Sequence, residues 1–143
     1  MSKPDELANK IAHTMLSREG TGAAWGIEIE EAREGYARIA MTVRRDMLNG
    51  HGIAHGGMVF ALADTAFAYA CNSRNVNTLA QHASITFLAP GKLGDRLVAE
   101  AWEEAAAGRS GVYTVVVTAP TGEKIAVFQG LSRTTGGPVL EVD

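Results

Sequence analysis

The sequence predicts an α+β fold in which one curved antiparallel sheet wraps around a long apolar helix. Residues 58–71 are apolar apart from Asp64 and Thr65, which is typical of a helix covered on nearly all sides. Four strand-like blocks follow it, separated by short segments rich in glycine, proline and charge. Short connections between consecutive strands favour antiparallel pairing, and a sheet that covers such a helix must curve around it.

Length and composition indicate one globular domain, which we expect to span residues 1–143. The net charge of −3, with no basic cluster, argues against a nucleic-acid partner. The single cysteine, Cys71, excludes an intrachain disulfide and makes the cytoplasm the simplest location. The first twenty residues lack the apolar core of a secretory signal, and no apolar run is as long as a membrane-spanning helix. We therefore expect a cytoplasmic protein with no membrane partner.

A helix and two strands are predicted before the central helix. Apolar residues recur every three or four positions after an early proline, which predicts an amphipathic helix within residues 1–20. The period then changes to two over residues 25–32 and 36–43, as in strands with one buried face. Gly35 lies between these two segments and predicts a hairpin turn.

A glycine-rich loop, NGHGIAHGG, leads into the central helix, which we expect over residues 55–74. Four blocks after this helix are rich in β-branched and apolar residues and are predicted to be strands. These blocks are ASITF, RLVAEAW, GVYTVVVTA and KIAVFQGLS.

Asp64 is the one acid in the central helix. Burying an ionised carboxylate costs several kcal/mol unless it is paired, hydrogen-bonded or protonated. Two interpretations are open from the acid alone: a structural carboxylate satisfied by backbone amides, or a functional group, because perturbed acids cluster at active sites. Asp64 lies in a stripe of residues spaced by three and four, namely Gly57, Phe60, Ala61, Phe67, Ala68 and Cys71.

The start of the helix has no serine, threonine or aspartate at the capping position beside His55, Gly56 and Gly57. We therefore expect free N–H groups here, at the positive end of the helix dipole. Glycine has no Cβ, so a substrate oxygen can approach this backbone closely, and such amides suit a developing oxyanion. The alternative is that the two glycines only allow a tight turn from loop to helix.

Gly56 and Asp64 are eight residues apart, hence ~12 Å apart along one helix. A reacting carbonyl needs its oxyanion donor and its base or nucleophile each at ~3 Å. The two groups of one chain therefore cannot serve one substrate. Two antiparallel copies of the helix would bring Gly56 of one copy to Asp64 of the other, which predicts an obligate homodimer if both residues are functional.

Two loop residues are further candidates. Asn49, seven residues before Gly56, either orients a water or the substrate carbonyl, or supplies turn geometry beside Gly50. His55 either fixes the loop through its ring nitrogens or assists at the carbonyl. His51 and His55 form an HxxxH pair, but no third ligand lies near them in the sequence, so we expect no metal site.

These residues carry a resemblance to a known family. The segment NGHGIAHGGMVFALADTAFAYACNS, the block FLAPGKLGDRLVAEA and the strand GVYTVVV resemble the hotdog-fold acyl-CoA thioesterases, most closely the phenylacetic acid degradation thioesterases. The resemblance covers about residues 25–137. Its specific part is HGG with an acid seven residues after its last glycine, on an apolar helix. An asparagine seven residues before its first glycine completes the pattern.

The resemblance implies a hotdog fold and hydrolysis of an acyl-CoA thioester to the free acid and CoA, with phenylacetyl-CoA or a ring-hydroxylated relative as substrate. It implies that Gly56 donates its N–H to the thioester oxygen, and that Asp64 of the opposite subunit acts as general base or nucleophile. Asn49 would place the carbonyl or the water, and His55 would support the loop.

The resemblance also suggests binding roles for Gly57, beside the thioester oxygen, and for Thr65, near the water. Arg109 and Arg133, at strand ends, are candidates for holding the CoA phosphates, although exposed arginines are often simply solvated. A related branch has threonine or serine where this chain has Ala68. The family needs no metal or redox cofactor, CoA being part of the substrate, and usually forms tetramers of two dimers.

Two other functions use the same fold. A hydratase or dehydratase pairs a catalytic histidine with an acid, but the proline-containing loop of such enzymes is absent after His55. A non-catalytic acyl-CoA sensor needs a DNA-binding module, and the 24 residues before Trp25 have no basic cluster and are too few for one. We therefore rank a hydrolase first, a hydratase second and a sensor third.

Overall fold

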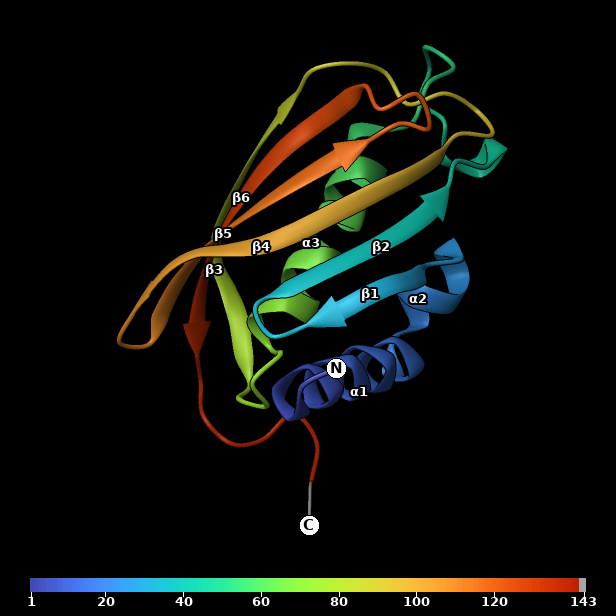
Figure 1. Cartoon of the computed structure of the whole chain (residues 1–143). Coiled ribbons are helices and arrows are strands. Elements are labelled where there is room, and N and C mark those ends of the chain that lie inside the picture. Colours follow the sequence, from blue (N-terminus) through green and yellow to red (C-terminus); the bar gives the residue numbers. More distant parts are fainter. Residues whose placement is uncertain (142–143) are drawn as a thin grey trace.

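Six strands form one antiparallel sheet that curves around helix α3 (Figure 1), which is the predicted hotdog arrangement. The computed structural model describes residues 1–141. The strands lie in the order β1-β2-β4-β5-β6-β3, and each neighbouring pair is antiparallel. The elements are α1 (Lys3–Arg18), α2 (Gly20–Trp25), β1 (Glu28–Arg33), β2 (Tyr36–Thr42), a 3₁₀ turn (Arg45–Met47), α3 (Gly56–Cys71), β3 (Thr78–Phe87), β4 (Arg96–Ala107), β5 (Ser110–Thr118) and β6 (Lys124–Thr134).

The N-terminal segment contains two helices rather than the one helix predicted within residues 1–20. The first, α1, is capped by Ser2, whose Oγ accepts the Asp5 N–H at 3.2 Å. The second, α2, was not predicted because its sequence, GTGAAW, contains two glycines, which disfavour a helix. It ends at Gly26, whose φ of +66° is left-handed. Trp25 therefore ends a helix instead of beginning a strand, and β1 starts three residues later than predicted.

The hairpin of β1 and β2 is confirmed, with Gly35 at its turn in a left-handed conformation (φ +70°). In β2, Ile39 and Met41 point toward α3 and are completely buried. The four predicted strands after the helix are confirmed as well, and β3, β4 and β6 extend beyond the blocks that predicted them.

Helix α3 begins one residue later and ends three residues earlier than the predicted range of 55–74. It ends where Asn72 folds back: its Nδ2 donates to the Ala68 carbonyl at 2.9 Å, and its Oδ1 accepts the Thr78 N–H at 2.9 Å. Gly130 of β6 lets the sheet approach the helix, because a Cβ there would lie 2.8 Å from the Phe67 ring. The core between helix and sheet contains Leu62, Ala66, Phe67, Leu97, Val115 and Phe128, all nearly or fully inaccessible to solvent.

One side of the protomer is not covered by the sheet. Strand β3 lies at the sheet edge and pairs only with β6, and most of its residues are exposed, including Leu79 at 64% and Phe87 at 52%. Helix α3 contacts β3 and leaves Phe60, Asp64 and Ala68 partly exposed. We call this surface of β3 and α3 the open face. Within residues 1–141 no helix has both the length and the apolar character needed to cross a membrane.

Candidate active site

The loop before α3 holds Asn49 in a fixed orientation. Its backbone N–H donates to the Ile53 carbonyl at 2.8 Å. Its side-chain Oδ1 accepts the N–H groups of His51 at 2.9 Å and of Ile53 at 3.3 Å. The amide Nδ2 has no hydrogen-bond partner among residues 1–141. Asn49 therefore forms the turn, and in doing so it leaves two side-chain N–H donors available.

His55 caps the N-terminus of α3. Its backbone N–H donates to the Met47 carbonyl at 2.8 Å, and its Nδ1 accepts the Gly57 N–H at 2.8 Å. The prediction of an uncapped helix with both glycine amides free is therefore wrong for Gly57. It missed that the imidazole Nδ1 can accept a hydrogen bond as an aspartate or asparagine cap does. The Gly56 N–H has no acceptor in the described part of the chain.

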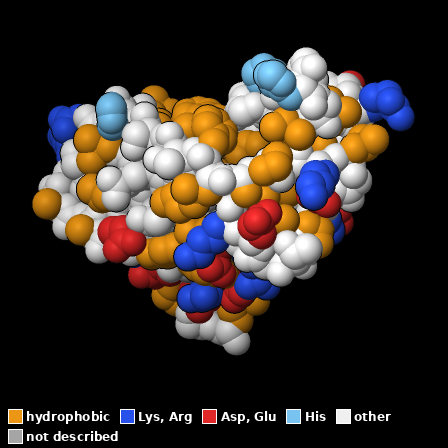
Figure 2. Space-filling model, turned by 90° about the horizontal axis from the view of Figure 1, so that it is seen from above, with side chains coloured by type: hydrophobic (Ala, Val, Ile, Leu, Met, Phe, Trp, Pro, Cys, Tyr) orange, Lys and Arg blue, Asp and Glu red, His pale blue; other side chains and the backbone are white. Residues whose placement is uncertain are grey.

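Gly56 and Asn49 border the same cavity, which has a volume of about 470 Å³. Figure 2 shows the end of the molecule where the loop before α3 meets the β3–β4 connection, with hydrophobic side chains gathered around a notch. The cavity wall is mostly apolar and consists of Ile53, Ala54, Val59, Phe87, Leu88, Ala89, Pro90, Gly91 and Ile125 besides the two polar positions.

Phe87, which the sequence analysis did not single out, covers Gly56. A Cβ at Gly56 would lie 3.1 Å from Cζ of the Phe87 ring, so a larger residue would displace the ring. Phe87 is the last residue of β3, in the FLAPG segment, which the sequence analysis used for a strand, its turn and the family resemblance but not for the site. An aromatic residue at the end of an exposed edge strand was the available signal.

Asp64 lies on the open face, two turns along α3 from Gly56. Because α3 is continuous, the separation along the helix axis is ~12 Å, as the sequence predicted. The carboxylate makes no hydrogen bond to residues 1–141, so no backbone amide of the protomer satisfies it. Partial burial raises its pKa above the ordinary value of an aspartate. Thr65 beside it donates its hydroxyl to the Ala61 carbonyl at 2.7 Å.

Arg109 and Arg133 lie together at the opposite end of α3. The Thr134 N–H donates to the Arg109 carbonyl at 2.8 Å, and Arg133 pairs with Ser110 across β5 and β6. Neither guanidinium forms an ion pair within residues 1–141. The structure therefore groups the two arginines, and separates them from the cavity at Gly56.

The remaining polar candidates do not form a second reactive centre. Among the described residues, no three histidine, cysteine, aspartate or glutamate side chains are grouped as a metal ion requires. Cys71 is buried, and burial, together with the charge of Asp64, raises the pKa of its thiol to about 12. A thiol of this pKa stays protonated at neutral pH and is a poor nucleophile.

Comparison with known proteins relates the chain to one family. Residues 51–126 match the model described as Thioesterase superfamily. The chain is 42% identical to acyl-coenzyme A thioesterase PaaI of Escherichia coli, over 90% of this chain and 91% of that protein. The structure of E. coli PaaI, from the phenylacetic acid degradation operon, superposes with a TM-score of 0.93 at 40% identity, covering 95% of this chain and 99% of that chain. A hypothetical thioesterase of Streptococcus pneumoniae with coenzyme A superposes with a TM-score of 0.76 at 28% identity, covering 78% and 90% respectively.

Proposed function

The chain belongs to the thioesterase superfamily and is an acyl-CoA thioesterase, and from this premise we propose that it hydrolyses arylacetyl-CoA thioesters at two equivalent sites of a homodimer. The substrate we propose is phenylacetyl-CoA or a ring-hydroxylated relative. The relationship to E. coli PaaI, from a phenylacetic acid degradation operon, supports this class. The observation that carries the site assignment is the free Gly56 N–H at the wall of an apolar cavity.

The oxyanion donors of this site are the Gly56 N–H and the Nδ2–H of Asn49. Both border the cavity, and neither has an acceptor among residues 1–141. Attack on the thioester carbonyl turns its oxygen into an oxyanion, and preorganised N–H donors stabilise that charge in a water-poor pocket. His55 keeps the geometry by capping the helix. Gly57 is not an oxyanion donor, because its N–H already donates to His55. Its contribution to the site is that it has no side chain that could obstruct the substrate.

Asp64 of the partner subunit is the base or nucleophile. As a base, it takes a proton from water while the water oxygen bonds to the carbonyl carbon; the C–S bond then breaks, and the CoA sulfur leaves and takes up a proton. As a nucleophile, the carboxylate oxygen bonds to that carbon first, the C–S bond breaks, and the CoA sulfur leaves and takes up a proton. Water then cleaves the resulting acyl-aspartyl anhydride, which releases the free acid and restores the carboxylate. Its lack of a partner within residues 1–141 and its raised pKa support either role. Thr65, next to it, lies near the attacking water.

The open face supports the dimer that this assignment needs. An unpaired edge strand offers a row of N–H and C=O groups to another chain, and β3 is such a strand. A twofold-related copy that pairs with β3 would extend the sheet and lay the two α3 helices antiparallel. Gly56 of one helix would then face Asp64 of the other. The exposed apolar residues Leu79 and Phe87 would become buried.

Arg109 and Arg133 are the residues we propose for the CoA phosphates, because their backbones are neighbours at the β5–β6 ladder and neither guanidinium has an ion-pair partner within residues 1–141. A tetramer of two dimers is a further part of the proposal. The outer face of the sheet supports it, because Val112, Val116 and Leu131 remain partly exposed there. No metal or redox cofactor enters the proposed reaction. A cytoplasmic location stays a prediction.

Subunit complementation tests the shared site. Gly56→Pro lacks the amide donor and Asp64→Asn lacks the carboxylate, so each homodimer should be nearly inactive toward phenylacetyl-CoA. When equal amounts are unfolded and refolded together, half of the dimers are hybrids, and each hybrid has one intact site. The mixture should therefore recover about a quarter of the activity of refolded wild type. Hybrids isolated by two affinity tags that show no activity above the single variants would contradict a site shared between subunits.

A further inference from the structure

Gly50, directly after Asn49, is a glycine that the fold does not require. Its backbone lies outside the left-handed region, whereas Gly52 in the same loop has a φ of +77°. A Cβ added to Gly50 would meet no atom within 4 Å, and the residue is exposed. Alanine would therefore fit here without strain or collision. Neither the conformation of the loop nor its packing explains the Asn-Gly pair.

An asparagine followed by glycine can modify itself. The backbone nitrogen of the glycine attacks the side-chain carbon Cγ, so that an N–Cγ bond forms and the Cγ–Nδ2 bond breaks. Nδ2 leaves as ammonia and takes the proton of the attacking nitrogen. Water then opens the resulting cyclic imide at one of its carbonyl carbons, which gives aspartate or isoaspartate. The reaction consumes only water, and glycine suits it best because no Cβ hinders the approach of its nitrogen.

The turn at Asn49 holds the reacting atoms together. Its Oδ1 accepts the His51 N–H at 2.9 Å, which closes a ring through the Cγ of Asn49 and the backbone nitrogen of Gly50. The Ile53 N–H donates to the same oxygen at 3.3 Å. When the nitrogen attacks, Oδ1 takes on negative charge, and these two donors stabilise that charge. The hydrogen bonds that fix Asn49 thus also activate its amide.

The attacking and the leaving nitrogen are both free. Within residues 1–141, neither the Gly50 N–H nor the Asn49 Nδ2 has a hydrogen-bond acceptor. Asn49 is half-buried at the cavity wall and Gly50 is exposed, so water can reach the imide. No hydrogen bond of the described chain has to break before the first step.

The asparagines after α3 differ in both respects. None of them precedes glycine, and they are Asn72, Asn75 and Asn77. Their Nδ2 groups each donate to a backbone carbonyl at 2.9 Å, and the acceptors are Ala68, Leu140 and Pro138 respectively. Ammonia can leave from these residues only after such a hydrogen bond breaks. They therefore serve as internal references for Asn49.

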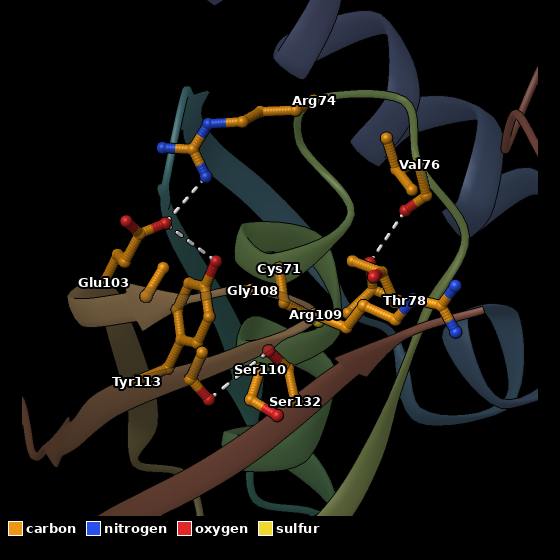
Figure 3. A pocket seen from close by; sticks show the side chains of 13 residues that line it. Cys71, Arg74, Val76, Thr78, Glu103, Gly108, Arg109, Ser110, Tyr113 and Ser132 are labelled. Carbon is orange, nitrogen blue, oxygen red and sulfur yellow. Dashed lines mark hydrogen bonds and ion pairs between the residues drawn. The ribbon is translucent and has the colours of Figure 1, made fainter. Parts of the chain in front are cut away.

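Two residues that follow these asparagines, Val76 and Thr78, are β-branched, which crowds their own backbone nitrogens. Figure 3 shows both at a second cavity, of about 190 Å³, at the C-terminal end of α3, which Cys71, Tyr113 and Ser132 also line. The Thr78 hydroxyl donates to the Val76 carbonyl at 2.8 Å. This segment is thus held in place and hindered where the loop at Gly50 is open.

We propose that Asn49 deamidates spontaneously in the folded protein and that this modification inactivates the site to which it belongs. The loss of activity rests on the proposed function, because it takes the Asn49 Nδ2–H as an oxyanion donor beside Gly56. Aspartate cannot donate at this position, and its charge opposes that of the oxyanion. Isoaspartate adds one carbon atom to the backbone and so moves the loop relative to α3. Both products remove the donor.

Mass spectrometry of peptides tests the modification, and thiol release from phenylacetyl-CoA tests its effect. Wild type is incubated at physiological temperature and mildly alkaline pH, where the attacking nitrogen loses its proton more readily. Fragment spectra should place the mass increase that exchange of NH2 for OH brings at Asn49, and leave the asparagines after α3 unchanged. At each time the remaining activity should equal the fraction of intact Asn49.

Gly50→Ala is the matched variant, because its Cβ meets nothing in the fold and hinders only the attacking nitrogen. It should start with wild-type activity, and both modification and inactivation should slow severalfold. Asn49→Asp represents one product from the start, and its kcat should lie about 10²- to 10³-fold below that of wild type, the usual loss for one oxyanion donor.

Modification of Asn75 or Asn77 as fast as that of Asn49, or an equal rate in Gly50→Ala, would overturn the proposal. A modified Asn49 with full activity would overturn the inactivation and remove Asn49 from the oxyanion donors, while the hydrolase remains. Fresh wild type that cleaves no acyl-CoA thioester would instead overturn the proposed function, and the mass measurement would still decide whether Asn49 deamidates.

Discussion

The Nδ1 atom of His55 accepts a hydrogen bond from the Gly57 N–H at 2.8 Å and so decides which amide of α3 remains free. The N–H groups of Met58 and Val59 both donate to the His55 carbonyl, at 2.9 and 3.2 Å. Within the described residues, Gly56 is therefore left as the one amide of the first turn without an acceptor. A single histidine fixes the helix start with its carbonyl and its ring, and the residue that keeps a free N–H, Gly56, lines the cavity.

The N–H donor of Gly56 can be removed by substitution with proline, with little disturbance of the backbone. Proline is well tolerated at the first helical position, and it requires an extended preceding residue, which His55 already is, with φ −60° and ψ 135°. We expect Gly56→Pro to lower kcat for phenylacetyl-CoA about 10²- to 10³-fold below Gly56→Ala, the usual loss for one oxyanion donor. Steady-state thiol release measures both variants.

Gly56→Ala is the matched control, because it adds a Cβ beside Phe87 and keeps the N–H. Equal activities of the alanine and proline variants would show that the amide donates to nothing in the transition state. A second control, Phe87→Leu combined with Gly56→Ala, separates the steric effect on the ring from the loss of the donor.

The cap at His55 predicts a stability effect that depends on the acceptor rather than on the ring. His55→Ala removes the acceptor of the Gly57 N–H and should lower the free energy of unfolding by about 0.5–2 kcal/mol. His55→Asn restores a side-chain acceptor and should recover most of this loss. Urea unfolding measures both. If the two variants are equally destabilised, the ring contributes by packing and not as a cap.

Much of the fold was predictable because it follows from local periodicity. The alternation in β2, the turn at Gly35 and the apolar run of α3 each specify one element without knowledge of the rest. Helix α2 was not predictable, because its glycine-rich sequence has low helix propensity. The ends of α3 depended on side-chain caps from His55 and Asn72, which hydropathy does not report.

The candidate site was predictable in part, for a different reason. The positions of Asn49, Gly56 and Asp64 were read from spacing, and the structure brings the first two to one cavity. The Phe87 ring that covers Gly56 lies thirty-one residues further along the chain. The spacing of residues within one helix or loop does not reveal contacts between segments so far apart in the sequence. Tyr113 and Ser132 meet Cys71 for the same reason, through the pairing of β5 with β6.

Removing the carboxylate of Asp64 should abolish most turnover. Asp64→Asn keeps the size of the side chain but cannot take a proton or attack the carbonyl, so we expect kcat to fall by about 10²–10⁴. Asp46→Asn is a suitable control, since Asp46 is an exposed acid paired with Arg44, away from the cavity. A folded dimeric Asp64→Asn enzyme with wild-type turnover would exclude Asp64 from the reaction.

The raised pKa of Asp64 predicts the acid limb of the pH–rate profile. The carboxylate acts only when ionised, so kcat/KM should fall as the pH drops through its pKa. Because burial raises this pKa, the fall should begin at a higher pH than for an ordinary aspartate. Burial of the open face in the proposed dimer would move the limb further in the same direction. A profile that stays flat down to the ordinary aspartate range would show that Asp64 is not desolvated in the active enzyme.

The raised pKa of Asp64 also predicts how stability depends on pH, and the direction is opposite to that of activity: activity rises with pH, whereas the contribution of Asp64 to stability falls. A group whose pKa is higher in the folded state stabilises the fold while protonated, and this contribution is lost as the pH rises through the folded-state pKa. Asp64→Asn does not titrate, so its unfolding free energy relative to wild type should increase from about pH 4 upward and then level off. Asp46→Asn should behave with the reverse sign: Arg44 lowers the pKa of Asp46, so this variant should be less stable than wild type at neutral pH, and the difference should vanish in acid. Urea unfolding at a series of pH values and one protein concentration measures both differences. If the unfolding free energies of Asp64→Asn and wild type changed with pH in parallel, folding would not change the pKa of Asp64, and its carboxylate would be as solvated in the folded protein as in the unfolded chain.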